Sequence, residues 1–367
     1  MTDLFSPIQL GDYQLPNRVF MAPLTRARSL AGGVPKAGLK AEYYSERASA
    51  GLIIAEATAV SPMGLGWLNT SGIWNEAQQE AWTPVTDAVH EKNGHIFIQL
   101  WHMGAIVTPD FIEGKQPLSA SNVQLEGELR TPNDRKQKLV EPKAMTITDI
   151  NQAQDEFVNA AKKSIAAGFD GVEIHAANGF LIDQFIRDKT NKRKDQYGGT
   201  IENRVRFCLE VVEKISKEIG SGKVGIRISP TNKVWGIKDS DYLKTFSYLV
   251  KQLNDYDLAY LHILEPKPNS DHFIETIDYI TPKLRELYQG IIIANGGYTK
   301  ETAMLSIQSN EADAIAFGSS FIANPDLVER FMKNAHLNVP ADDSLYYSND
   351  AEGYTKYPTL EKLRKTA

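Results

Sequence analysis

The sequence has almost no cysteine and no long apolar run. Cys208 is the only cysteine among 367 residues, so neither a disulfide nor a cysteine-ligated iron–sulfur cluster can form within one chain, and a reducing compartment is indicated. No apolar stretch approaches the length that crosses a bilayer, and the first residues lack the charged and then apolar pattern of a signal peptide. We expect a soluble, cytoplasmic protein without a membrane partner.

The sequence also lacks a strong excess of one charge and a recognisable metal site. Its net charge is -6 with both signs interspersed, which argues against a nucleic-acid partner. His90, His95 and His102 lack the cysteine or carboxylate neighbours that zinc sites use, so we expect no bound metal. With 42% hydrophobic residues, a chain of this length can bury a full core without disulfides or a structural metal.

Eight short apolar runs recur along the whole chain. Several are nearly continuous rather than alternating, which is typical of parallel strands covered on both faces. Patterns with helical spacing separate them, and eight such units without a break in composition favour a closed (β/α)8 barrel of the TIM type, in the α/β class. The expected strands are 18–23, 51–57, 96–100, 171–175, 224–229, 259–263, 290–295 and 313–318.

Two of the intervening helices have start and stop signals. We expect Thr200 to cap a helix that Gly220 ends, and Thr148 to begin a helix that Gly168 ends. Apolar residues recur at three- and four-residue spacing within both, as packing on a sheet requires. They are Val205, Leu209, Val212, Ile215 and Ile219 in the first helix, and Ile150, Phe157, Ala161 and Ile165 in the second.

Two segments fall outside this repeat of strands and helices. Residues 4–17, with Gly11-Asp12 between apolar stretches, predict a β-hairpin that closes the bottom of the barrel. Residues 106–143 are rich in proline, glycine and charge, and predict an excursion after the third strand, where long loops usually shape active sites. We expect residues 1–367 to form a single domain.

One glycine motif resembles a phosphate-binding loop but stands in the wrong place. Residues 220–225, Gly-Ser-Gly-Lys-Val-Gly, match the glycine spacing of the dinucleotide-binding fingerprint. That fingerprint must follow a strand and open a helix, whereas this segment follows a predicted helix and precedes a strand. We therefore expect no dinucleotide to bind there.

Polar and glycine residues gather at the ends of the expected strands. The segment 171–180 is the most informative, because it places His175 and Asn178 just beyond an apolar strand, where parallel sheets collect ligands. If the barrel closes, the residues at all of these strand ends converge on one rim. The others are Pro23, Leu24, Thr25, Ala57, Gln99, Arg227, Asn295, Gly296, Gly297, Gly318 and Ser319.

The chemistry of this rim fits flavin mononucleotide (FMN). Gly296, Gly297 and Gly318, after the last two strands, let backbone N–H groups approach a phosphate, in the position where barrels commonly bind one. Gln99 and Thr25 offer amide and hydroxyl contacts to a heterocycle, and Arg227 offers a charge that would stabilise an anionic reduced flavin. Each residue also has a structural alternative: Arg227 could pair with a carboxylate, Gln99 could satisfy backbone groups, and His175 could cap a strand.

Seven segments, spread almost from end to end, are specific when taken together. They are 4–7 (LFSP), 17–26 (NRVFMAPLTR), 99–104 (QLWHMG), 175–179 (HAANG), 195–204 (DQYGGTIENR), 321–327 (FIANPDL) and 353–358 (GYTKYP). In these segments the chain resembles the Old Yellow Enzyme family of NADH:flavin oxidoreductases, most of all its N-ethylmaleimide reductase-like branch of FMN-dependent ene-reductases.

The resemblance implies where the cofactor and the substrate bind. Ala57 would lie against the flavin ring, the loops 295–297 and 318–319 would hold its phosphate, and Thr25, Gln99 and Arg227 would contact the ring. His175 and Asn178 would donate hydrogen bonds to an oxygen of the substrate and, in the other half-reaction, to the nicotinamide of NAD(P)H. Positions that line the substrate cavity in the family correspond to Trp67, Trp101 and Tyr347, for which ordinary aromatic packing is the alternative.

The chain departs from the family pattern at two positions of the implied site. Phe180 stands where the family usually has a tyrosine that protonates the substrate carbon, so water or another group such as Tyr347 would have to supply the proton. Ser319 stands where an arginine commonly binds the FMN phosphate, which predicts weaker retention of FMN. Hydride transfer itself needs neither residue.

The resulting hypothesis is an NAD(P)H-dependent FMN oxidoreductase that reduces activated C=C bonds of α,β-unsaturated carbonyl compounds, with nitro compounds as a further class. The alternative is an FMN-binding barrel with little turnover that serves as a binding or sensor protein, and the missing tyrosine is its only support. A dienoyl-CoA reductase-like enzyme is excluded, because its cluster needs several cysteines. The partner is a small molecule, and the protein is expected to be a monomer or a homodimer.

Overall fold

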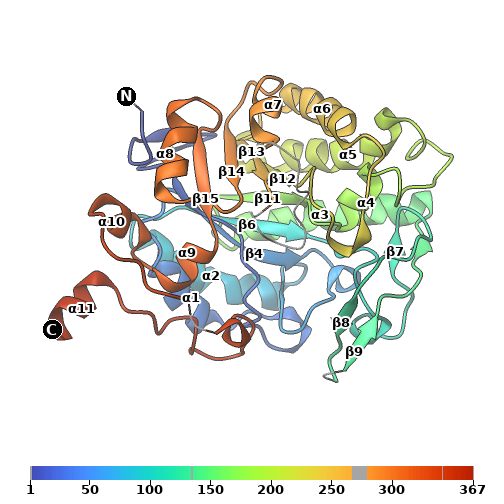
Figure 1. Cartoon of the computed structure of the whole chain (residues 1–367). Helices are drawn as coiled ribbons and strands as arrows, with labels where there is room; N and C mark the ends of the chain where they lie inside the picture. The colour runs from blue at the N-terminus through green and yellow to red at the C-terminus, as the bar shows by residue number, and fades with distance from the viewer. Residues whose placement is uncertain (1, 134, 267–278, 341, 367) are drawn as a thin grey trace.

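Eight parallel strands form a closed barrel in the computed structural model, which describes residues 2–133, 135–266, 279–340 and 342–366 (Figure 1). The barrel closes because β3 pairs with β15 on one side and with β4 on the other. The (β/α)8 prediction is confirmed, and each strand lies where its apolar run predicted. The strands are β3 (Val19–Met21), β4 (Ile53–Ala59), β6 (Ile96–Trp101), β11 (Gly171–Ala176), β12 (Val224–Ile228), β13 (Tyr260–Leu264), β14 (Ile292–Asn295) and β15 (Ala314–Phe317).

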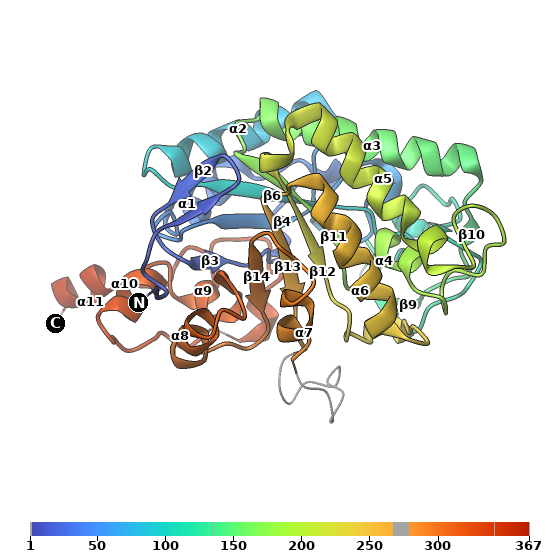
Figure 2. The same cartoon turned by 90° about the horizontal axis from the view of Figure 1, so that it is seen from above.

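Helices surround the barrel, and Figure 2 shows α2, α3, α5 and α6 lying along the outside of the strands. Their apolar sides pack against the outward-facing strand residues in one continuous core. The helices are α1 (Ala37–Ser45), α2 (Glu76–His90), α3 (Ile147–Ala166), α4 (Leu181–Ile186), α5 (Ile201–Ile219), α6 (Tyr242–Leu253), α7 (Thr281–Arg285), α8 (Lys300–Gln308), α9 (Ser319–Ala323), α10 (Leu327–Met332) and α11 (Leu360–Thr366).

The two helices with predicted boundaries differ in outcome. The Thr200 side chain accepts a hydrogen bond from the backbone N–H of Asn203 at the start of α5, and Gly220 ends that helix, as predicted. The prediction of Thr148 as the start of α3 is wrong. Thr146 caps that helix instead, because its hydroxyl accepts the N–H of Asp149 while the Asp149 carboxylate accepts the N–H of Thr146.

The predicted hairpin closes the amino-terminal end of the barrel. Strands β1 (Ile8–Leu10) and β2 (Tyr13–Leu15) pair antiparallel, and their buried side chains join the inward-facing residues of the barrel strands in one cluster. A side chain at Gly11 would overlap the backbone carbonyl of Gly222, which lies in the loop before β12. A side chain at Gly222 would in turn overlap Asp12, so Gly222 lets the hairpin approach the barrel closely and has a structural role within segment 220–225.

The segment 106–143 follows β6 and forms small sheets beside the barrel. Strands β8 (Glu128–Arg130) and β9 (Lys136–Lys138) pair as an antiparallel hairpin, which projects from the body in Figure 1. Strands β7 (Leu118–Ser119) and β10 (Lys143–Ala144) pair in parallel, and β5 (Ser71–Gly72) extends the barrel sheet beside β4. Within the described part of the chain, no helix combines the length and the apolar character that a membrane span needs.

Candidate active site

Two adjacent cavities open at the carboxyl ends of the barrel strands, and every residue proposed from the strand ends and the family pattern lines one of them. The first has a volume of about 300 Å³, and the second, about 460 Å³. Leu24 and Ser319 line both cavities, so the two are continuous at these residues. The first is also lined by Pro23, Thr25, Ala57, Trp67, Gln99, Trp101, His175, Asn178, Phe180, Arg227 and Tyr347, and the second by Asn295, Gly296, Gly297 and Gly318.

His175 is a neutral hydrogen-bond donor at the first cavity. Its Nδ1 accepts the backbone N–H of Ala177 at 3.3 Å, which leaves the ring proton on Nε2. Burial, together with the charge of Arg227 and the neighbouring His262, lowers the pKa of His175 well below its usual range. The imidazole is therefore uncharged near neutral pH and donates without acting as an acid.

Asn178 is held in a fixed orientation next to His175. Its backbone has the left-handed conformation, with φ of 57°, and its N–H donates to the Ser229 hydroxyl at 2.8 Å. The side-chain oxygen of Asn178 accepts a hydrogen bond from Nδ2 of Asn232 at 2.8 Å. Because the oxygen is engaged, the NH₂ group of Asn178 remains as a donor.

The interior of the barrel beneath the first cavity holds a buried polar network. Nε2 of Gln99 donates to the Glu173 carboxylate at 2.7 Å, and Nδ1 of His262 contacts the other carboxylate oxygen at 2.7 Å. The amide oxygen of Gln99 is then left to accept a bond from a ligand. Arg227 donates through Nη2 to Asn295 at 2.7 Å, while its buried Nε has no partner among the described residues. The unpaired buried N–H of Arg227 and the amide oxygen of Gln99 belong to residues that both line this cavity, and such groups fit the polar edge of a flavin ring.

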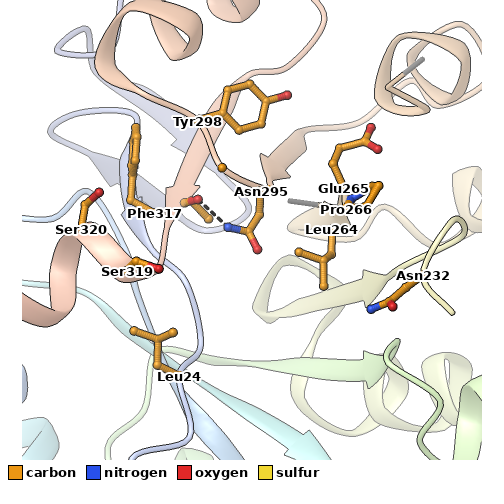
Figure 3. Close-up of a pocket in the computed structure, with 14 residues that line it drawn as sticks. Leu24, Asn232, Leu264, Glu265, Pro266, Asn295, Tyr298, Phe317, Ser319 and Ser320 are labelled. Atoms are coloured by element: carbon orange, nitrogen blue, oxygen red, sulfur yellow. Dashed lines mark hydrogen bonds between the residues drawn. The ribbon is translucent and has the colours of Figure 1, made fainter. Parts of the chain in front are cut away.

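The second cavity lies at the ends of β13, β14 and β15 (Figure 3). Gly296 and Gly297 follow β14 with positive φ angles of 139° and 76°, and Gly318 follows β15. A side chain at Gly296 would lie 2.5 Å from the backbone oxygen of Glu265, so this glycine permits close packing of two loops. Backbone N–H groups and the hydroxyls of Tyr298, Ser319 and Ser320 are among the donors of this cavity.

Comparisons with known proteins agree with this geometry. The sequence profile of the NADH:flavin oxidoreductase / NADH oxidase family matches residues 3–338. The chain belongs to the Old Yellow Enzyme family. A 12-oxophytodienoate reductase 1 from Oryza sativa subsp. japonica is 42% identical over 364 residues, which cover 98% of this chain and 94% of that protein.

Solved structures of Old Yellow Enzyme relatives superpose on almost the whole chain. An Old Yellow Enzyme homologue from Zymomonas mobilis has a TM-score of 0.94 at 43% identity, covering 98% of this chain and 100% of that chain. Morphinone reductase in complex with tetrahydroNAD has a TM-score of 0.92 at 42% identity, with 98% of each chain covered. The protein is therefore an FMN-dependent ene-reductase of this family that uses NAD(P)H, which confirms the predicted cofactors.

Aromatic rings line the first cavity of this Old Yellow Enzyme. Phe180 lies 4.8 Å from the rings of both Trp101 and His175, in edge-to-face arrangements, and only 6% of its surface is exposed. Trp67 and Tyr347 form a tilted pair at 5.7 Å, with Tyr347 half exposed. The Trp67–Tyr347 pair thus lies nearer to solvent than Phe180 does.

The sequence motifs did not reveal how Tyr347 is held at the cavity. The carbonyl oxygen of Tyr346 accepts hydrogen bonds from Nε of Arg26 at 3.1 Å and from Nη1 of Arg28 at 2.6 Å. Both arginines are almost completely buried and lie over the ring of Tyr354. These buried arginines fix the C-terminal segment against the loop after β3. The signal available in the sequence was the pair of arginines at positions 26 and 28, just after Thr25.

The remaining residues that line the two cavities were not predicted from the sequence. Arg26, Ile322 and Tyr346 complete the lining of the first cavity. Those missed in the second cavity are Asn232, Leu264, Glu265, Pro266, Tyr298, Ala316, Phe317 and Ser320. Glu265 was the clearest available signal, because it is a polar residue directly after β13, the one barrel strand at whose end no site residue was predicted.

Proposed function

We propose that the protein reduces the C=C bond of α,β-unsaturated carbonyl compounds, and that nitro compounds are a further substrate class. The observation that supports this proposal is the pair of neutral, oriented donors, His175 and Asn178, at a cavity lined by aromatic rings. Two donors aimed at one substrate oxygen withdraw electron density from the conjugated alkene. They also stabilise the negative charge that develops on that oxygen during reduction.

FMN bound in the two cavities would supply the hydride that NAD(P)H provides. Thr25, Gln99 and Arg227 would hold the ring, with Pro23, Leu24 and Ala57 as its apolar surroundings. The loops 295–297 and 318–319 would surround the phosphate end. The fixed charge of Arg227 would favour the electron-rich reduced state, because a buried cation stabilises added negative charge.

His175 and Asn178 would also receive the nicotinamide amide, so one site would serve both half-reactions in turn. The neutral state of His175 favours this double use, because a charged imidazolium would repel the nicotinamide cation that is released. Asn232 would act as a positioning residue that keeps the Asn178 donor aimed at the ligand.

Phe180 has no acidic proton to give to the substrate carbon. The substrate carbon would therefore be protonated by water that enters the first cavity or by Tyr347, a half-exposed residue of the cavity lining. Trp67, Trp101 and Phe180 would set the shape of the substrate site. We also propose that residues 1–367 act as one FMN-binding domain, in the cytoplasm, as a monomer or a homodimer.

The proposal is tested by NADPH and NADH oxidation with 2-cyclohexenone under anaerobic conditions. We expect His175→Ala and Asn178→Ala to lose roughly 10²- to 10³-fold in kcat/KM for the enone, as is typical for the removal of a charge-stabilising donor. His336→Ala, at an exposed histidine outside both cavities, is the matched control. A yellow protein that oxidises no NAD(P)H with any enone would instead favour a binding or sensor protein.

A further inference from the structure

The second cavity has no positive charge among the described residues that line it. The hydroxyls of its lining belong to Tyr298, Ser319 and Ser320 (Figure 3), and the backbones of Gly296, Gly297 and Gly318 also line it. The described lining contains no lysine, arginine or histidine. Because the phosphate of a flavin nucleotide is close to doubly charged at neutral pH, its removal from water needs strong compensation.

The two side-chain amides of this cavity are engaged elsewhere. Nδ2 of Asn295 donates to the carbonyl oxygen of Ala316 at 2.7 Å, while its oxygen accepts from Arg227. Asn232 donates to Asn178, and its oxygen accepts the N–H of Val234 at 3.1 Å. Neither amide can move to a phosphate without giving up a bond within the protein.

The cavity contains a carboxyl group instead of a cation. Glu265 is 1% exposed, and one of its oxygens accepts the backbone N–H of Thr281 at 2.6 Å and the Thr281 hydroxyl at 2.7 Å. The other oxygen is buried and has no partner among the described residues. If Glu265 is ionised it repels a phosphate, and if it is protonated it adds no positive charge.

Two cations of the barrel, Arg227 and Lys300, are engaged with other parts of the molecule. Arg227 lines the first cavity and is held there by Asn295. Lys300, at the start of α8, donates to the carbonyl oxygen of Phe331 and to Asn334, on the outer side of the barrel. Thus the charge that binds the cofactor is concentrated at the ring end.

We propose that this site takes its affinity from the flavin ring and ribityl chain, so that riboflavin binds about as well as FMN. The inference rests on the proposed flavin site, and it extends the cofactor class to the dephosphorylated flavin. Neutral donors gain little from a phosphate whose charge must be desolvated beside Glu265. The dissociation constants for FMN and riboflavin should then lie within roughly 10-fold of each other.

The test measures the binding of each flavin to the full-length apoprotein by quenching of flavin fluorescence, which needs no turnover. An equimolar mixture of both flavins, with the bound fraction extracted and separated by chromatography, gives the same ratio independently. We expect Ser319→Arg to raise the affinity for FMN by roughly 10- to 100-fold and to leave riboflavin unchanged, because it adds a charge-assisted bond to the phosphate alone. Ser319→Gln, which adds length without charge, is the matched control.

The possible outcomes separate this inference from the proposed function. Binding of FMN more than 100-fold tighter than that of riboflavin overturns the inference and leaves the flavin site intact. The inference is also overturned, with the flavin site intact, if Lys267→Ala weakens FMN binding without affecting riboflavin binding. Lys267 lies outside the described residues. Failure of both flavins to bind overturns the proposed function and the inference together. Comparable affinities in the parent chain, with FMN gaining selectively in Ser319→Arg, support the inference.

Discussion

Phe180→Tyr is the substitution that bears most directly on the chemistry of this enzyme. It adds one hydroxyl to a ring that already lines the first cavity, within 4.8 Å of the His175 and Trp101 rings. His175 cannot serve as the acid, because burial and the charge of Arg227 hold its pKa well below the usual range. The new phenol would thus be the first buried proton donor beside the reacting carbon.

The expected gain follows from the worth of a positioned general acid, which is about 10²- to 10⁴-fold in rate. This corresponds to a barrier lower by about 3–5 kcal/mol. The gain is confined to substrates whose protonation limits the rate, because hydride transfer does not involve the phenol. Fold stability should change little if the hydroxyl faces the cavity, whereas a hydroxyl turned towards the apolar cluster with Ile237 would cost about 1–3 kcal/mol.

Stopped-flow measurement of the two half-reactions separates these effects. Reduction of the enzyme by NADPH should be unchanged in Phe180→Tyr, while reoxidation by slow enones becomes faster and loses part of its solvent isotope effect. Phe111→Tyr, which adds a hydroxyl in the excursion outside both cavities, is the control. Identical reoxidation rates for several enones in the parent and in Phe180→Tyr would refute the reasoning.

Three further predictions concern buried groups around the site. Burial lowers the pKa of His102 to about 4 from 6.5, so the unfolded state binds the proton first. The contribution of His102 to the free energy of unfolding is therefore fully present above pH 6.5, and about 2 kcal/mol of it is lost by pH 5. Urea unfolding of His102→Asn should show a smaller loss between these pH values than the parent. An equal pH dependence in the two proteins would contradict the prediction. Glu56→Gln leaves the buried Lys40 without a charged partner and should destabilise the fold by about 3–5 kcal/mol in the same assay. A loss below about 1 kcal/mol would argue that Lys40 is neutral in the folded protein. Glu173→Gln removes one of the two carboxylate oxygens that accept from Gln99 and His262. It should lower the free energy of unfolding by about 1.5–3 kcal/mol and weaken flavin binding. Unchanged flavin affinity would show that other residues set the orientation of Gln99.

The barrel could be predicted because each strand is a short apolar run that is buried on both faces. All seven residues of β4, for example, are buried. Such a continuous apolar run can be recognised in the sequence without knowing which residues it contacts. The start of α3 was misjudged because two threonines lie near the boundary. Only Thr146 has an aspartate three residues later, and this reciprocal pair is the stronger capping signal.

Site residues at the ends of barrel strands could be predicted from the sequence. Site residues whose position depends on the path of a loop could not. His175 and Arg227 are neighbours because β11 and β12 pair in parallel with these residues in register. The contact between Asn232 and Asn178 joins residues 54 positions apart through an irregular loop, and no periodic pattern encodes it. The same applies to the C-terminal segment, where Arg26 and Arg28 bind a carbonyl oxygen from more than 300 positions away in the sequence.

The distribution of charge over the two cavities explains why Ser319 can be tolerated. The ring end has a buried guanidinium and an oriented amide oxygen, which are fixed by hydrogen bonds between barrel strands. It also has two neutral donors, which are held by hydrogen bonds from loop residues. Reduction adds negative charge at the ring, whereas the phosphate keeps its charge throughout the cycle, so a cation at the phosphate would strengthen binding of both redox states alike. A cation at the ring favours the reduced state selectively. In this chain the positive charge therefore lies where it affects the reaction, and its absence from the described lining of the second cavity should reduce cofactor retention without slowing hydride transfer.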